Sequence, residues 1–145
     1  MAFLKKPVLS KSNSHFETII GSSSRIDGNL SISENIRIDG IINGNILQIE
    51  GKQITVAVAN GASILGDIRA DNIILSGKVV GNLFTQNMVE VLSTAEINGD
   101  INYVNISMEA GANIKGQLNK INESTGVEAA THLVIDQVKQ KSSQA

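Results

Sequence analysis

A short pattern recurs six times along this chain: an aliphatic residue, any residue, Gly, a polar residue and a second aliphatic residue. The successive Gly positions lie 16, 22, 15, 18 and 17 residues apart. Helical hairpin repeats and propeller blades need roughly 33 to 50 residues, so this unit has room only for two or three short strands and their corners. The spacing predicts an all-β, single-domain parallel β-helix (β-solenoid) of about six coils. The repeat glycines are Gly28, Gly44, Gly66, Gly81, Gly99 and Gly116.

The repeat also predicts which side chains face the interior. We expect the two aliphatic residues, at i and i+4, to share one face of a strand and to point inward, with the Gly between them where space is tight. The residue after each Gly is Asn, Asn, Asp, Asn, Asp and Gln in order. Stacked coils would therefore carry a ladder of amides and carboxylates along one outer edge, at a corner of the backbone. The acidic residues Asp27, Asp39, Asp67, Asp71 and Asp100 are interpreted as a solvated face.

The composition fits a narrow aliphatic interior and disfavours several classes of protein. Hydrophobic residues make up 41% of the chain but aromatic residues only 3%, as expected where Ile, Val and Leu fill the core. A net charge of −2 provides no electrostatic footprint for nucleic acid. There is no Cys, hence no disulfide framework or thiolate metal site. No apolar run has the length of a membrane span or a signal peptide, and we therefore expect a cytoplasmic protein.

A polar tail precedes the repeats, which occupy residues 18–121. Residues 1–17 show no helical or strand period, and their Pro, Ser and Asn content favours disorder. One interpretation of residues 1–17 is therefore an ordinary disordered tail without a binding role.

The start of that tail combines apolar and basic residues: Phe3 and Leu4 directly precede Lys5 and Lys6. Each Lys near an anionic membrane surface contributes about 1 kcal/mol. Full burial of Phe or Leu contributes about 1.5 to 3 kcal/mol. One copy would bind weakly, whereas many copies along an assembly would bind by avidity. The four residues are therefore predicted to bind a membrane.

Two further segments depart from the repeat. The second interval is about five residues longer than its neighbours, which predicts a bulging loop near Glu50 to Gln53, either a tolerated insertion or a binding surface. Residues 122–145 carry no repeat and are expected to be disordered. Apolar residues between 127 and 139 fall near helical spacing, so the alternatives are a short helix and a cap folded over the last coil.

Catalytic motifs are absent from the repeats. The two histidines, His15 and His132, lie in the two tails, so a three-His zinc site cannot be built in the coils. Residues 21–24 lack the ending of a phosphate-binding loop, and residues 39–45 depart from the calcium-binding solenoid repeat. We expect no enzyme activity, no cofactor and no metal. The alternative is an acyltransferase-like enzyme on a left-handed β-helix, which would need a catalytic His at a subunit boundary; a secreted adhesin would need an export signal.

The ends of such a solenoid are its reactive parts. Each coil buries its faces only against its neighbours, so the first and last coils present unpaired backbone groups over an apolar core. The sequence contains no strong cap at either end, and end-to-end stacking would continue the sheets into a filament. The residues predicted for this polymerisation interface are Ile19, Ile20, Ile26, Leu30, Met108, Ile114, Leu118 and Ile121.

Several runs of this sequence resemble the bactofilin family over residues 18–121, namely 19–21, 38–46, 61–68, 97–101 and 108–112. The resemblance implies a right-handed parallel β-helix with disordered tails, and self-assembly without nucleotide into cytoskeletal filaments in which like ends meet. It also implies a tail that binds the inner membrane, a character that Phe3, Leu4, Lys5 and Lys6 match. The partners implied are other copies of the chain, the inner membrane and cell-wall or cell-shape proteins, with no nucleic acid.

Overall fold

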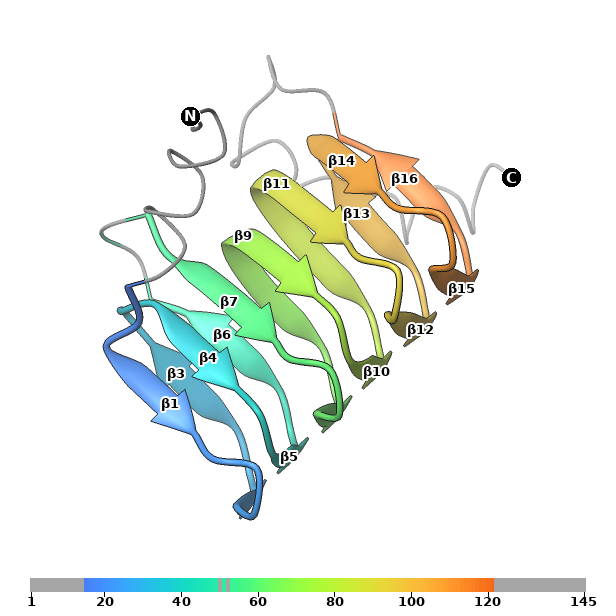
Figure 1. Ribbon diagram of the computed structural model, residues 1–145. Coiled ribbons are helices and arrows are strands. Elements are labelled where there is room, and N and C mark those ends of the chain that lie inside the picture. The colour runs from blue at the N-terminus through green and yellow to red at the C-terminus, as the bar shows by residue number, and fades with distance from the viewer. Residues whose placement is uncertain (1–14, 50, 52, 122–145) are drawn as a thin grey trace, which may run out of the picture.

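The computed structural model describes residues 15–49, 51 and 53–121. Within these ranges the chain forms sixteen strands and no helix, and every strand pairing is parallel. The strands wind into a rod of about six stacked coils (Figure 1). The predicted all-β parallel solenoid is therefore confirmed. The four residues predicted to bind a membrane, Glu50, the C-terminal tail and His132 lie outside the described residues.

Each coil places one short strand on each of three faces, which we number from the chain start. Face 1 holds β1 (Thr18–Ile20), β4 (Ile36–Ile38), β7 (Thr55–Val58), the second halves of β9 (Ile68–Leu75) and β11 (Leu83–Val91), and β14 (Asn105–Met108). Face 2 holds β2 (Arg25–Asp27), β5 (Ile41–Asn43), β8 (Ser63–Leu65), β10 (Lys78–Val80), β12 (Glu96–Asn98) and β15 (Asn113–Lys115). Face 3 holds β3 (Leu30–Ile32), β6 (Ile46–Gln48), the first halves of β9 and β11, β13 (Ile101–Tyr103) and β16 (Leu118–Lys120).

Two long strands join face 3 to face 1. β9 and β11 continue through the corner between these faces, and β11 shows a register shift between Thr85 and Met88 relative to β9. Faces 1 and 3 consequently form one ten-stranded sheet, while face 2 is a separate six-stranded sheet. Figure 1 shows face 2 along one edge of the rod, with face 1 in front and face 3 behind it.

The register stacks aliphatic side chains into inward-facing columns. Because every pairing is parallel, equivalent residues of successive coils lie directly above one another, and their side chains point to the same side. In the inner coils these side chains are at most 2% exposed. Full burial of one such side chain contributes about 1.5 to 3 kcal/mol, so these columns are the main source of stability. The column of face 2 consists of Ile26, Ile42, Ile64, Val79, Ile97 and Ile114.

The repeat pattern itself lies across a corner, which corrects one expectation. β2 ends at Asp27 and β3 begins at Leu30, so Ile26 and Leu30 belong to different faces and not to one strand. Both still point inward, because the chain turns between them at Gly28 and the residue after it. The close approach expected at the Gly is present: a Cβ on Gly81 would overlap the carbonyl oxygen of Gly66 in the coil below.

The predicted ladder at this corner is confirmed. In the first five coils, the side-chain oxygen of the residue that follows the repeat Gly accepts a hydrogen bond from the backbone N–H of its counterpart in the next coil. These bonds satisfy N–H groups that the sheets leave unpaired, and each contributes about 1 kcal/mol. The acceptor and donor pairs are Asn29 Oδ1 and Asn45 N (2.9 Å), Asn45 Oδ1 and Asp67 N (2.8 Å), Asp67 Oδ1 and Asn82 N (2.9 Å), Asn82 Oδ1 and Asp100 N (2.9 Å), and Asp100 Oδ1 and Gln117 N (2.9 Å).

The extra residues of the long second interval are shared between two corners. Residues 49–54 connect β6 to β7, where residues 33–35 make the same connection one coil earlier. Residues 59–62 connect β7 to β8, where residues 39–40 suffice in the preceding coil. The expected loop is thus present on one side, with Gly51 and Gln53 exposed, but it accounts for only part of the added length.

Asp71 closes the base of this loop, and its assignment to a solvated face is wrong. Asp71 is only 9% exposed. Its carboxylate accepts hydrogen bonds from Gln48 Nε2 (2.8 Å) and from the backbone N–H of Ile54 (3.2 Å), and its own N–H donates to Gln48 Oε1 (2.7 Å). Buried carboxylates need such donors, and these bonds tie both ends of the 49–54 segment to β9.

Candidate functional site

The first and last coils each carry three edge strands. Among the described residues β1, β2 and β3 pair only with the second coil, and β14, β15 and β16 pair only with the fifth. The outer backbone N–H and C=O groups of six strands are therefore left without a sheet partner. Unpaired edges of this kind are templates for another chain.

At the two ends of the rod, the inward-facing aliphatic side chains are partly exposed. Met108 and Leu118 in the last coil are 45% and 44% exposed, although their counterparts one coil earlier, Val91 and Ile101, are fully buried. In the first coil, each of the three faces contributes one inward-pointing aliphatic residue that is partly buried and packs against the core. An apolar cross-section of the core thus lies at each end of the rod. These first-coil members are Ile20, Ile26 and Leu30.

The structure places two of the predicted interface residues differently from the others. Ile19, 61% exposed, belongs to an outward-facing row of face 1 that continues with Arg37 and Ala57, and so points to the side of the rod. Ile121 follows β16, and its backbone N–H donates to the carbonyl oxygen of Tyr103 at 2.6 Å. Ile114 is partly buried at the end of the face 2 column.

Polar contacts on the first coil are concentrated at Asp27. Arg25 Nε donates to its carboxylate at 3.1 Å, and Asn43 Nδ2 of the second coil donates to the same oxygen at 2.7 Å. These hydrogen bonds, first that of Asn43 and then that of Arg25, hold the pKa of the Asp27 carboxyl below its ordinary value. The bond to Asn43 ties the first coil to the second on the outer surface of face 2.

A second row of asparagines, at the corner between faces 3 and 1, escaped the sequence analysis. Asn35 Oδ1 accepts from the N–H of Thr55 (2.8 Å), Asn87 Nδ2 donates to Asn72 Oδ1 (2.8 Å), and Asn105 Nδ2 donates to the carbonyl of Asn87 (3.0 Å). The available signal was an Asn one or two residues before the aliphatic start of four of the six face 1 strands, at positions 35, 72, 87 and 105.

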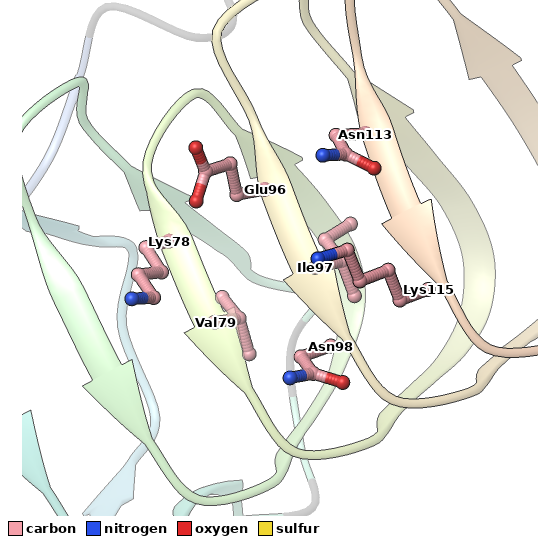
Figure 2. A pocket seen from close by; sticks show the side chains of 7 residues that line it. All are labelled: Lys78, Val79, Glu96, Ile97, Asn98, Asn113 and Lys115. Atoms are coloured by element: carbon pink, nitrogen blue, oxygen red, sulfur yellow. The ribbon is translucent and has the colours of Figure 1, made fainter.

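A small hollow on the outside of face 2 is the nearest feature to a ligand pocket there. It has a volume of about 120 Å³, whereas ligand sites usually measure about 300 to 1,000 Å³. Figure 2 shows Lys78, Glu96 and Lys115 around it, on three successive strands. Lys78 and Glu96 are register partners, yet their charged groups point in different directions (Figure 2). The described ranges contain no group of three or more His, Cys, Asp or Glu residues that could hold a metal ion. The same ranges contain no helix long and apolar enough to cross a membrane.

The comparisons with known proteins agree with this geometry. The model of the bactofilin family, described as polymer-forming cytoskeletal, matches residues 18–119. Bactofilin BacO of Myxococcus xanthus is 33% identical over 106 residues, which cover 70% of this chain and 77% of that protein. Bactofilin BacP of the same organism is 27% identical over 110 residues, covering 76% of this chain and 44% of that protein. No solved structure matches significantly. The resemblance inferred from the repeats is confirmed, and the chain belongs to the bactofilin family of polymer-forming cytoskeletal proteins.

Proposed function

We propose that this protein is a cytoskeletal scaffold whose rods join through their end coils into filaments, without nucleotide and without catalytic activity. The observation that supports it best is the pair of open ends, where edge strands surround partly exposed columns of Ile, Leu and Met. Stacking the end coil of another molecule on either end would bury these columns and give the edge strands backbone partners.

The energetics of such a contact favour a register-specific joint. Half-exposed aliphatic side chains each gain about 0.8 to 1.5 kcal/mol on full burial, so three columns from two partners contribute about 5 to 9 kcal/mol. Association costs about 4 to 15 kcal/mol in lost freedom. Burial alone therefore roughly balances the cost, and the backbone hydrogen bonds of the edge strands supply the surplus. Those bonds form only when the two coils meet in register.

A charge in the last coil tests the joint. Leu118→Arg should give folded molecules that do not polymerise, because the guanidinium would be buried in the apolar contact without a partner. These are monomers if unlike ends meet, and at most dimers joined at the first coil if like ends meet. The matched control is Leu65→Arg, since Leu65 is 51% exposed on the side of the rod and lies in no end coil. Electron microscopy and pelleting without nucleotide should show filaments for the parent and the control only. A parent protein that stays monomeric at high concentration would contradict filament formation, and filaments of Leu118→Arg would contradict the end contact.

Single cysteines can establish which ends meet. The chain has no Cys, so Leu118→Cys introduces the only thiol. If like ends meet, as the family resemblance implies, two copies of residue 118 approach each other and oxidation should yield covalent dimers. If unlike ends meet, residue 118 faces the first coil, and dimers should appear only when Leu118→Cys is mixed with Leu30→Cys.

We further propose that the filaments lie at the inner membrane and organise cell-wall or cell-shape proteins. The support is the apolar and basic start of the chain, Phe3 to Lys6, together with the family. Deletion of residues 2–6 should abolish co-sedimentation with anionic liposomes while filaments still form. A deletion variant that pellets with liposomes as the parent does would remove the membrane role. Capture of partners from cells of the source organism would identify the proteins that are scaffolded.

A further inference from the structure

A shallow groove runs over face 1 on the outside of the rod. Its volume is about 600 Å³. Its floor contains three small residues, Ala57 and Ala59 in the third coil and Ser76 in the fourth, and one larger outward-facing residue, the half-buried Ile74. On one side it is bounded by Arg37, whose Nε donates to Asp39 at 2.8 Å, and on the other by residues 92–94 of a four-residue turn.

The chain segment that precedes β1 already enters this groove. Phe16 is partly buried and lines one side of it. The segment is fixed at the corner by Asn35: its Nδ2 donates to the carbonyl oxygen of His15 (3.1 Å), and its backbone N–H donates to the Glu17 carboxylate (3.0 Å). The N–H of Glu17 in turn donates to the carbonyl oxygen of Asn35 (3.1 Å). The described chain therefore begins beside the groove.

The groove and the tail have complementary charges. Glu90 and Glu109 line the part of the groove toward the C-terminal coils. The carboxylate of Glu90 is on a partly buried residue and makes no hydrogen bond or ion pair with the described residues. Residues 1–14 contain Lys5, Lys6 and Lys11 and no acidic residue. A lysine of the tail would give Glu90 the partner that the described part of the chain does not provide.

The length of the tail suffices to follow the groove. From Arg37 in the second coil to Glu109 in the sixth, the distance is about 19 Å at the usual spacing of ~4.8 Å between strands. The seven residues 8–14 span up to about 23 to 25 Å when fully extended. We propose that residues 8–14 of the same chain lie along this groove, with Lys11 near Glu90 and with Val8 and Leu9 near the turn at 92–94. Residues 1–7 would then emerge from face 1, which would orient that face toward a membrane; only this orientation rests on the proposed function.

Cross-linking in the full chain tests the docking. Leu9→Cys combined with Ser93→Cys, in the turn that bounds the groove, should form an intramolecular disulfide several-fold faster than Leu9→Cys combined with Asn98→Cys. Asn98 is the matched control because it lies exposed in the same coil but on face 2. In the Ser93 pair, Glu90→Lys should reduce the rate several-fold, whereas Glu96→Lys on face 2 should leave it unchanged.

The rate of disulfide formation within one chain tests the docking without requiring filaments or membranes. Equal rates for the two cysteine pairs would overturn the proposal, as would a rate in the Ser93 pair that Glu90→Lys leaves unchanged. Disulfides formed mainly between copies, detected by mixing chains of two different masses, would assign the groove to the tail of a neighbouring molecule and overturn docking within one chain. Loss of filaments in Leu118→Arg with the intramolecular disulfide intact would separate this inference from the proposed assembly.

Discussion

Replacing one repeat glycine in an inner coil and one in the first coil separates the role of the repeat in folding from its role at the end of the rod. Gly81 (φ 154°) and Gly28 (φ 136°) both adopt a backbone conformation that side chains disfavour. An Ala at either position should therefore cost about 1 to 3 kcal/mol in strain. The two sites differ in what the new methyl group meets. At Gly81 it overlaps the carbonyl oxygen of Gly66, whereas at Gly28 nothing lies within 4 Å.

The overlap determines the difference in stability. Overpacking costs about 1 to 3 kcal/mol, and the obstacle at Gly81 is backbone, which cannot rotate away. Gly81→Ala should thus lose about 2 to 6 kcal/mol and Gly28→Ala about 1 to 3 kcal/mol, by the strain and packing terms together. Domains of this size are usually stable by about 5 to 15 kcal/mol, so Gly81→Ala should be severely destabilised. Urea unfolding followed by circular dichroism, in the Leu118→Arg background to suppress assembly, measures both values.

The same pair of variants probes the end of the rod. In the inner coils the missing Cβ points toward the preceding coil, so a methyl group on Gly28 should project from the first coil into any contact made there. Gly28→Ala is therefore expected to fold but to pellet less than the parent protein. Equal losses of stability in the two variants would refute the overlap argument, and parental pelleting of Gly28→Ala would refute contact at the first coil.

Two further predictions concern polar contacts within the rod. Asp71→Ala should lower the free energy of unfolding by about 1 to 3 kcal/mol, because the N–H of Ile54 and the amide of Gln48 lose their buried acceptor. Urea unfolding measures this loss against Glu96→Ala, a change at an exposed residue of face 2. Because the pKa of Asp27 is lowered in the folded protein, its contribution to stability is present above its unfolded value of 3.8 and is lost as the pH falls through the folded pKa. Melting temperatures between pH 2 and 6 should therefore decline less in Asp27→Asn than in the parent, and parallel declines would contradict the role of Asn43 as a donor to the carboxylate.

The long second interval shows how far local sequence constrains a solenoid. Its length was readable from the glycine spacing, and an added loop could be placed near Glu50 to Gln53. Its division between residues 49–54 and 59–62 was not readable, because either corner can absorb extra residues without disturbing the stacked strands. Asp71 was misjudged because its burial depends on residues far away in the sequence: its carboxylate is enclosed only when neighbouring coils bring Gln48 and the N–H of Ile54 to it.

The sequence by itself determined the architecture, the aliphatic interior and the ladder that follows the glycines, because a spacing of about seventeen residues with a fixed order of side-chain types permits few other arrangements. Only the tertiary structure decided where the corners fall. Ile26 and Leu30 point inward whether they share a strand or flank a turn, so their spacing alone cannot distinguish the two cases. Stacking also decided that Ile19 faces sideways and that Phe16 lies in a groove, since both depend on the register between coils, which is set by contacts between residues far apart in the chain.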